Sequence, residues 1–129
     1  MLSYRIRQDK GYVEITGVQD SDPLEFTRLF EKIFADPAYR RGLGFYRDRR
    51  GMAPITSAML RANMADLSSM PELLGSRWAY VVTDASNFGM ARMAALLGDS
   101  SALELAIFEA PELAIAWLAE RQELAIDEA

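Results

Sequence analysis

Apolar and polar residues alternate with a period of two in two short segments near the N-terminus. Residues 4–7 and residues 12–15 both show this alternation, and a polar turn sequence that ends in Gly11 separates them. A period of two is typical of a strand that buries one face. The two segments therefore predict a β-hairpin.

The next segment changes to the period of an α-helix. Its apolar residues are spaced as they would be on one helical face. Asp22 is the predicted N-cap and Pro23 the predicted first helical residue. The helix is predicted to end at Asp36, because a residue that precedes proline disfavours the helical conformation. The apolar face consists of Phe26, Leu29, Phe30, Ile33 and Phe34.

Strands and helices alternate in the rest of the chain. Strands are predicted at 42–46, 78–82 and 103–108, and helices at about 56–67, about 86–97 and from Pro111. The last helix carries the apolar residues Leu113, Ala114, Trp117 and Leu118. The continuous apolar run 78–82 indicates a strand covered on both faces. The order ββαβαβαβα predicts an α/β fold with a mixed five-stranded sheet, the first strand antiparallel at the edge, and about four helices.

The composition limits the number of domains and the kinds of catalytic or metal-binding group that the chain can have. A chain of 129 residues fits one domain, which we place at 1–119, followed by an acidic helix extension or tail at 120–129. Because the sequence contains neither cysteine nor histidine, it excludes disulfides, thiol nucleophiles, imidazole bases and the usual zinc ligands. We therefore expect no metal, no cofactor and no catalysis.

Charge and hydropathy limit the classes of binding partner that we expect. The net charge of −5 makes nucleic acid a poor candidate, since phosphate neutralisation needs a broad basic face. No segment approaches the apolar length of a membrane span or a signal peptide, so we expect a cytoplasmic protein that is not integral to a membrane. Five arginines between positions 40 and 50 leave a local site for a small anion or an acidic partner surface open.

Polar residues follow the third and fourth predicted strands. Ligands of open α/β sheets bind beyond the carboxyl ends of the parallel strands, where arginine side chains and helix N-termini favour an anionic group. The alternative is a solvated charged loop in which Asp48 pairs with its neighbours. The candidate binding residues are Arg47, Asp48, Arg49, Arg50, Thr56, Ser57, Asp84 and Ser86.

Methionines concentrate in the middle of the chain. Six of the seven lie between residues 52 and 93. Flexible thioethers on neighbouring helices would line an adaptable apolar groove for a lipid tail or a partner helix, or they would simply fill the core. The candidate groove residues are Met59, Met64, Met90 and Met93.

The order of elements resembles the STAS domains, the SpoIIAA-like fold of anti-sigma-factor antagonists, which is related to the lipid-binding CRAL-TRIO domains. The hairpin, the strand end at 45–51, the segment 85–93 and the closing segment 107–118 carry the resemblance. It implies a regulatory module whose phosphoacceptor serine falls on Ser57, with Thr56 in place of the family's aspartate. The alternative role for Ser57 or Thr56 is that of a helix N-cap.

Three functional hypotheses follow. The first is a non-catalytic STAS-like regulatory module that binds a protein partner. The second is a carrier or sensor of a small hydrophobic or anionic ligand, such as a lipid in the methionine-rich groove. An enzyme would rest on Asp48 and Asp84 alone, and is the weakest of the three. A homodimer through the exposed edge of the hairpin is also predicted, because unpaired edge strands invite pairing.

Overall fold

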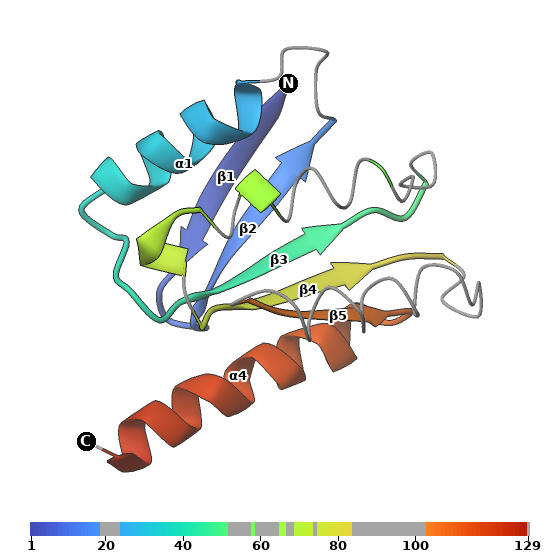
Figure 1. Cartoon of the computed structure of the whole chain (residues 1–129). Coiled ribbons are helices and arrows are strands. Elements are labelled where there is room, and N and C mark those ends of the chain that lie inside the picture. The colour runs from blue at the N-terminus through green and yellow to red at the C-terminus, as the bar shows by residue number, and fades with distance from the viewer. Residues whose placement is uncertain are drawn as a thin grey trace.

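The computed structural model of the chain describes residues 1–18, 24–51, 58, 65–66, 69–73, 75–83 and 103–128. This part of the chain has an α/β fold in which five strands form one sheet in the order β1-β2-β3-β4-β5 (Figure 1). The elements are β1 (Leu2–Arg7), β2 (Tyr12–Gly17), α1 (Glu25–Ala35), β3 (Gly44–Asp48), the short 3-10 helix η1 (Pro71–Leu73), β4 (Arg77–Val81), β5 (Glu104–Phe108) and α4 (Pro111–Glu128).

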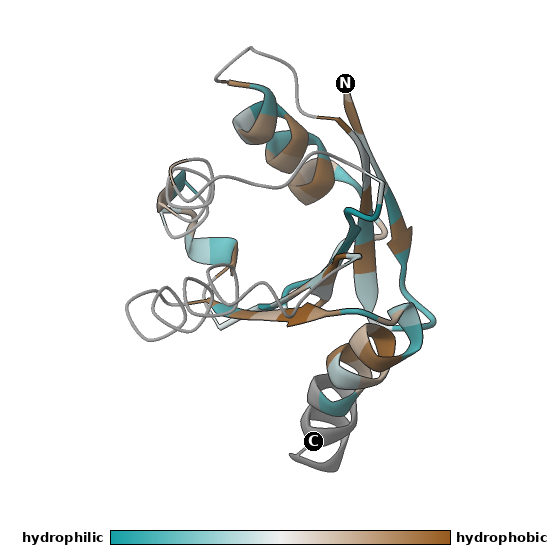
Figure 2. Cartoon of the chain, turned by 90° about the vertical axis from the view of Figure 1, so that its right-hand side faces the viewer, coloured by the Kyte–Doolittle hydropathy of each residue, from teal (hydrophilic) through white to brown (hydrophobic). Residues whose placement is uncertain are grey.

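The sheet is mixed, as predicted. β1 pairs antiparallel with β2, and β3, β4 and β5 each pair parallel with the strand before them. Successive parallel strands are added to the sheet in one direction. Right-handed crossover connections between such strands all lie on the same face of the sheet. In Figure 2, α1 lies on the concave face of the twisted sheet, whereas α4, which follows the last strand, lies on the opposite face.

The described residues contain two α-helices, and not about four as the sequence predicted. The two middle helices, predicted at about 56–67 and about 86–97, fall almost entirely outside the described residues. Within them only Ala58, Ala65 and Asp66 are described, and all three are helical. The α/β class and the mixed sheet are therefore confirmed for the described part of the chain, and the two middle helices stay predictions.

The apolar face of α1 is the predicted one. Phe26, Leu29, Phe30 and Ile33 are buried, and Phe34 packs against the same cluster. The predicted start of this helix was two residues too early, because α1 begins at Glu25 and the N-cap position, Leu24, has no side-chain cap hydrogen bond. Asp22 and Pro23 lie outside the described residues. The end was predicted correctly, with Asp36 in an extended conformation before Pro37.

Two apolar clusters cover the two faces of the sheet. The side facing α1 buries Phe45, Trp78 and Tyr80, and the side facing α4 buries Ala79 and Val81. Alternate residues of β4 thus enter both clusters, which confirms the predicted strand covered on both sides, one residue earlier than the predicted 78–82.

The third strand lies two residues later than predicted. Gly42 has a φ of +103°, a left-handed conformation that suits glycine, and it belongs to the turn that precedes the strand. The strand instead continues through Arg47 and Asp48, which pair with Tyr80 and Val81 of β4. The first two residues of the charged sequence 47–50 therefore belong to the sheet, and Arg49 and Arg50 follow the strand.

Helix α4 packs on the sheet through one side. Ala114 and Leu118 are buried and Trp117 is partly buried against Phe108, whereas Leu113 is 59% exposed. Pro111 begins this helix, as predicted. None of the described helices combines the length and the apolar character needed to cross a membrane.

Arg77, the first residue of β4, joins α4 to the sheet. Its Nη1 donates to the carbonyl oxygen of Trp117 at 2.7 Å and its Nε donates to Glu104 at 2.8 Å. Its guanidinium also lies 4.6 Å from the centre of the Trp117 ring. Planar stacking and directed hydrogen bonds together favour arginine here over lysine.

We expect Arg77→Met to lower the free energy of unfolding by about 1–2 kcal/mol, because it removes a hydrogen bond from a cation to a partly buried carbonyl and a cation–π contact. Urea titration followed by circular dichroism measures the change. The matched control is Arg5→Met on the exposed edge strand, which should stay within about 0.5 kcal/mol of the wild type. Equal changes in the free energy of unfolding for the two variants would contradict the conclusion that Arg77 joins α4 to the sheet.

Candidate functional site

The carboxyl ends of the parallel strands lie at one edge of the sheet, but their charged side chains divide between its two faces. Asp48 and Arg50 form a bidentate ion pair, with Arg50 Nη2 2.7 Å from Asp48 Oδ2 and Nε 3.0 Å from Oδ1. Hydrogen bonds from Arg50 lower the pKa of the Asp48 carboxyl, despite the opposing effect of its partial burial. This pair matches the charged-loop alternative for Asp48.

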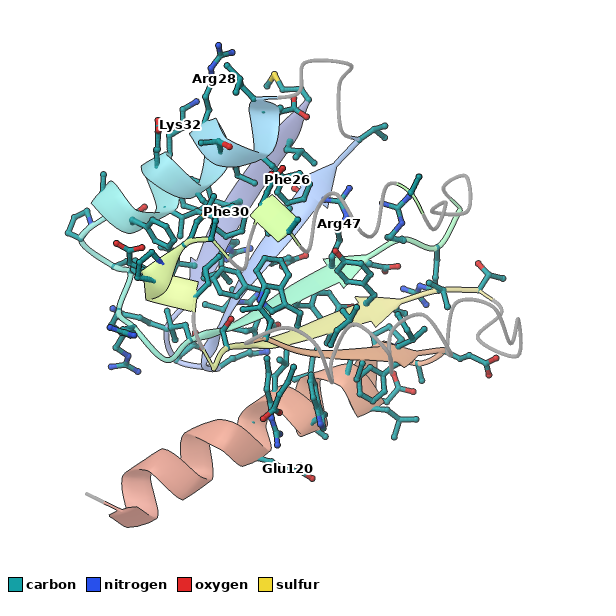
Figure 3. All side chains as sticks on the ribbon, viewed as in Figure 1. Phe26, Arg28, Phe30, Lys32, Arg47 and Glu120 are labelled. Atoms are coloured by element: carbon teal, nitrogen blue, oxygen red, sulfur yellow. The ribbon has the colours of Figure 1, made fainter. Side chains whose placement is uncertain are left out.

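Arg47 points to the other face, because neighbouring residues of a strand alternate. Its side chain extends on the same side of the sheet as α1 (Figure 3) and is only 3% exposed. Its Nη2 donates to the carbonyl oxygen of Gly17 at the end of β2, at 3.2 Å. Its Nη1 is buried and has no hydrogen-bond partner among the described residues.

The surroundings of Arg47 are apolar apart from a few groups. In the sheet it lies between Ile15 of β2 and Tyr80 of β4, both buried. Burial lowers the pKa of the Arg47 guanidinium, and the positive charge of Arg49 lowers it further while Glu25 raises it. Burial in turn raises the pKa of the Tyr80 phenol, against the effect of the Arg47 charge. A guanidinium remains charged even when its pKa falls, so this is a desolvated cation with unused donor capacity.

The predicted arginine-rich rim is therefore not one site. The structure places Arg47 on the α1 side, buried, and joins Asp48 to Arg50 as a separate pair. Arg49 is half-buried, and its backbone N–H donates to the carbonyl oxygen of Val81 at 2.7 Å. The other predicted residues lie outside the described part of the chain, namely Thr56, Ser57, Asp84, Ser86, Met59, Met64, Met90 and Met93.

The sequence analysis missed the groups that surround Arg47. The carbonyl of Gly17, the phenol of Tyr80 and the carboxylate of Glu25 come from three different elements. The spacing of Phe45 and Arg47 was a signal of this burial, because residues two positions apart in a strand lie on the same face. Had the strand been extended to Asp48, the pattern would have placed Arg47 on the buried face beside Phe45.

The described residues include no group of three or more acidic side chains that could hold a metal ion. Of the two carboxylates that an enzyme would require, Asp48 is paired with Arg50 and Asp84 lies outside the described residues. What the described edge offers chemically is electrostatic binding by Arg47.

All five tyrosines have raised pKa values, and this predicts a loss of stability in alkali. Hydrogen bonding to Asp36 is the main cause for Tyr4, and burial is the main cause for the others, Tyr80 included. Because folding raises these pKa values above about 10, the value in the unfolded chain, the stabilisation is present below that pH and is lost as the pH rises through the folded-state values.

The expected result is a free energy of unfolding that falls steadily above about pH 10, measured by urea titration at a series of pH values. Tyr80→Phe removes one of the titrating groups and should make the fall less steep. A wild-type stability that stays level to pH 11, or a Tyr80→Phe protein with an unchanged slope, would contradict the prediction.

Comparisons of the chain with models of protein families, with curated proteins and with solved structures found no match. The resemblance to STAS domains consequently stays a prediction that depends on the order of elements and on the segments quoted above.

Proposed function

We propose that the chain is a non-catalytic regulatory module of the STAS type, located in the cytoplasm, that acts by binding a protein partner. The observation that carries the proposal is the sheet: an antiparallel hairpin strand at one edge, followed by four strands that pair in chain order and in parallel. This arrangement agrees with the element order on which the resemblance depends, and α helices pack on both faces of the sheet.

A non-catalytic role is supported by the state of the described charged groups. Asp48 is held as a carboxylate by Arg50, whereas a general acid or base needs a pKa near the working pH. Arg47 is buried and supplies charge but no transferable proton. Binding is the chemistry that these groups favour.

The experiment tests the switch that the resemblance implies at Ser57. We expect affinity capture from cells that produce the protein to recover a partner with the wild-type chain and to lose it with Ser57→Asp, because an added negative charge at a helix start changes local electrostatics. Ser69→Asp is the matched control; Ser69 is exposed and its hydroxyl donates to the carbonyl oxygen of Asp66. Identical capture by all three proteins, with Ser57 unmodified in mass spectra, would refute the switch.

A second candidate function is a carrier or sensor of a small hydrophobic or anionic ligand. The buried Nη1 of Arg47, which has no partner among the described residues, specifically favours it. Native mass spectrometry of freshly purified protein is expected to show a co-purifying small molecule. If every preparation, under conditions that preserve non-covalent complexes, has only the mass of the chain itself, this second function loses its support.

A further inference from the structure

The buried guanidinium of Arg47 lacks the compensation that a desolvated charge ordinarily has. Buried polar groups in native proteins are nearly always hydrogen-bonded, and buried charges are nearly always paired. Arg47 is 3% exposed. Among the described residues its Nη2 donates to the carbonyl oxygen of Gly17, whereas Nη1 has no partner. The described residues do not provide an acceptor for Nη1, and a bound ligand would satisfy it.

Neither Asp48, the neighbour in sequence, nor Glu25, whose charge acts on Arg47, supplies that acceptor. Asp48 points to the opposite face and is engaged by Arg50 through both of its oxygens. Glu25 at the start of α1 acts on Arg47 through its charge, but no ion pair joins the two side chains. The unused donor therefore lies on the α1 side of the sheet, where an anion would meet a cation that burial has already desolvated.

The charge and the surroundings specify the kind of anion. Arg47 carries one positive charge and is desolvated. It offsets one negative charge of a buried ligand, whereas a dianion would keep a second charge uncompensated, so a monoanion fits better than a phosphate dianion. The neighbouring side chains in the sheet, Ile15 and Tyr80, are buried in the apolar cluster, so a ligand with an apolar body suits the layer.

We infer that Arg47 binds the carboxylate of an apolar monocarboxylic acid, with Nη1 as the donor that the ligand engages. This inference rests on the second candidate function, ligand carriage or sensing, and gives it a residue and a chemical class. Arg47 is a preformed binding group, because the bond from Nη2 to the Gly17 carbonyl already fixes the plane of the guanidinium.

The test is isothermal titration of the full chain with laurate below its micelle concentration, with dodecanol, dodecyl phosphate and inorganic phosphate as comparison probes. We expect laurate to bind and the three other probes to bind at least about 10-fold more weakly, since each lacks either the single charge or the apolar body. Arg47→Met should weaken laurate binding by about 10- to 100-fold, the range for a hydrogen-bonded charge.

Arg28→Met is the matched control. Arg28 is exposed and projects from α1 away from the sheet, so its loss removes the same charge from the same protein without touching the layer beneath (Figure 3). We expect this variant to bind laurate as the wild type does. Arg47→Lys, which keeps the charge but not the planar fork, should give an intermediate affinity.

A second measurement uses only the wild-type chain, and so does not depend on how any variant folds. Nitrogen-15 NMR of the arginine side chains should show a slowly exchanging guanidinium for Arg47 that shifts when laurate is added, while the Arg28 signal stays in place. Laurate binding without a shift of the Arg47 signal would overturn the site.

The remaining outcomes separate the site from the function. Laurate binding that Arg47→Met leaves unchanged would overturn the site and keep the carrier function. Equal or tighter binding of dodecanol or dodecyl phosphate would overturn the carboxylate class in the same way. If none of the probes binds and no small molecule co-purifies, both the site and the second candidate function are refuted, and the protein-binding proposal stands by itself.

Discussion

Replacing Trp78 by alanine is expected to lower the free energy of unfolding by about 3–5 kcal/mol, a large part of the stability of an ordinary domain. Trp78 is 1% exposed and stacks on Phe45 with ring centres 4.4 Å apart. It also contacts Phe30 of α1, and its indole N–H donates to the hydroxyl of Ser76 at 2.9 Å. The substitution therefore leaves a cavity where the sheet meets α1 and removes the bond that the Ser76 hydroxyl accepts, although this hydroxyl still donates to the Leu73 carbonyl.

Trp117→Ala is the matched control, because this second tryptophan packs partly buried between α4 and the sheet. We expect its loss to cost about half as much, since less area leaves water there. Urea titration monitored by circular dichroism gives both values. If Trp117→Ala proves the more damaging change, α4 and not the layer beneath α1 is the main source of stability.

The elements that the sequence predicted well are those whose periodicity has one physical cause. The apolar face of α1 follows from a helical spacing that only burial against a sheet explains, and Phe30 and Ile33 are fully buried there. The run that includes Trp78 and Val81 lacks polar positions because both faces of β4 are covered.

The end of β3 could not be predicted in the same way. A cluster of charged residues usually indicates a solvated loop, and it ended the predicted strand at Tyr46. Pairing with β4 determines the outcome instead, because Arg47 and Asp48 lie opposite Tyr80 and Val81. Such pairing joins residues more than thirty positions apart, and no local pattern contains it.

The candidate site was predicted by position but not by geometry. The rule that ligands bind at the carboxyl ends of parallel strands selected Arg47, Asp48 and Arg50 correctly as residues of that edge. The alternation of side chains along β3 then separates them, so that Arg50 neutralises Asp48 on one face and Arg47 is buried on the other. The rule gives the edge of the sheet at which the residues lie, but the pleat of the strand determines the face on which each side chain lies.

Replacing Arg47 by methionine is expected to raise the free energy of unfolding by about 1–3 kcal/mol, and the melting temperature by several degrees. A desolvated guanidinium with an unpartnered Nη1 opposes folding, whereas methionine fills a similar volume without a charge. Loss of the bond from Nη2 to Gly17 offsets about 1 kcal/mol of the gain. Differential scanning calorimetry measures the result, with Arg28→Met as the control expected to stay within about 0.5 kcal/mol of the wild type.

The sign of this change decides between two roles for Arg47. A structural arginine, satisfied by acceptors within the chain, would leave them unpaired on removal, and the variant would lose several kcal/mol. A binding arginine is retained at a cost to the stability of the ligand-free protein, so its removal should stabilise the fold while it weakens binding. A destabilised Arg47→Met protein would therefore contradict both this prediction and the carboxylate site, because the donor capacity that both require would already be in use.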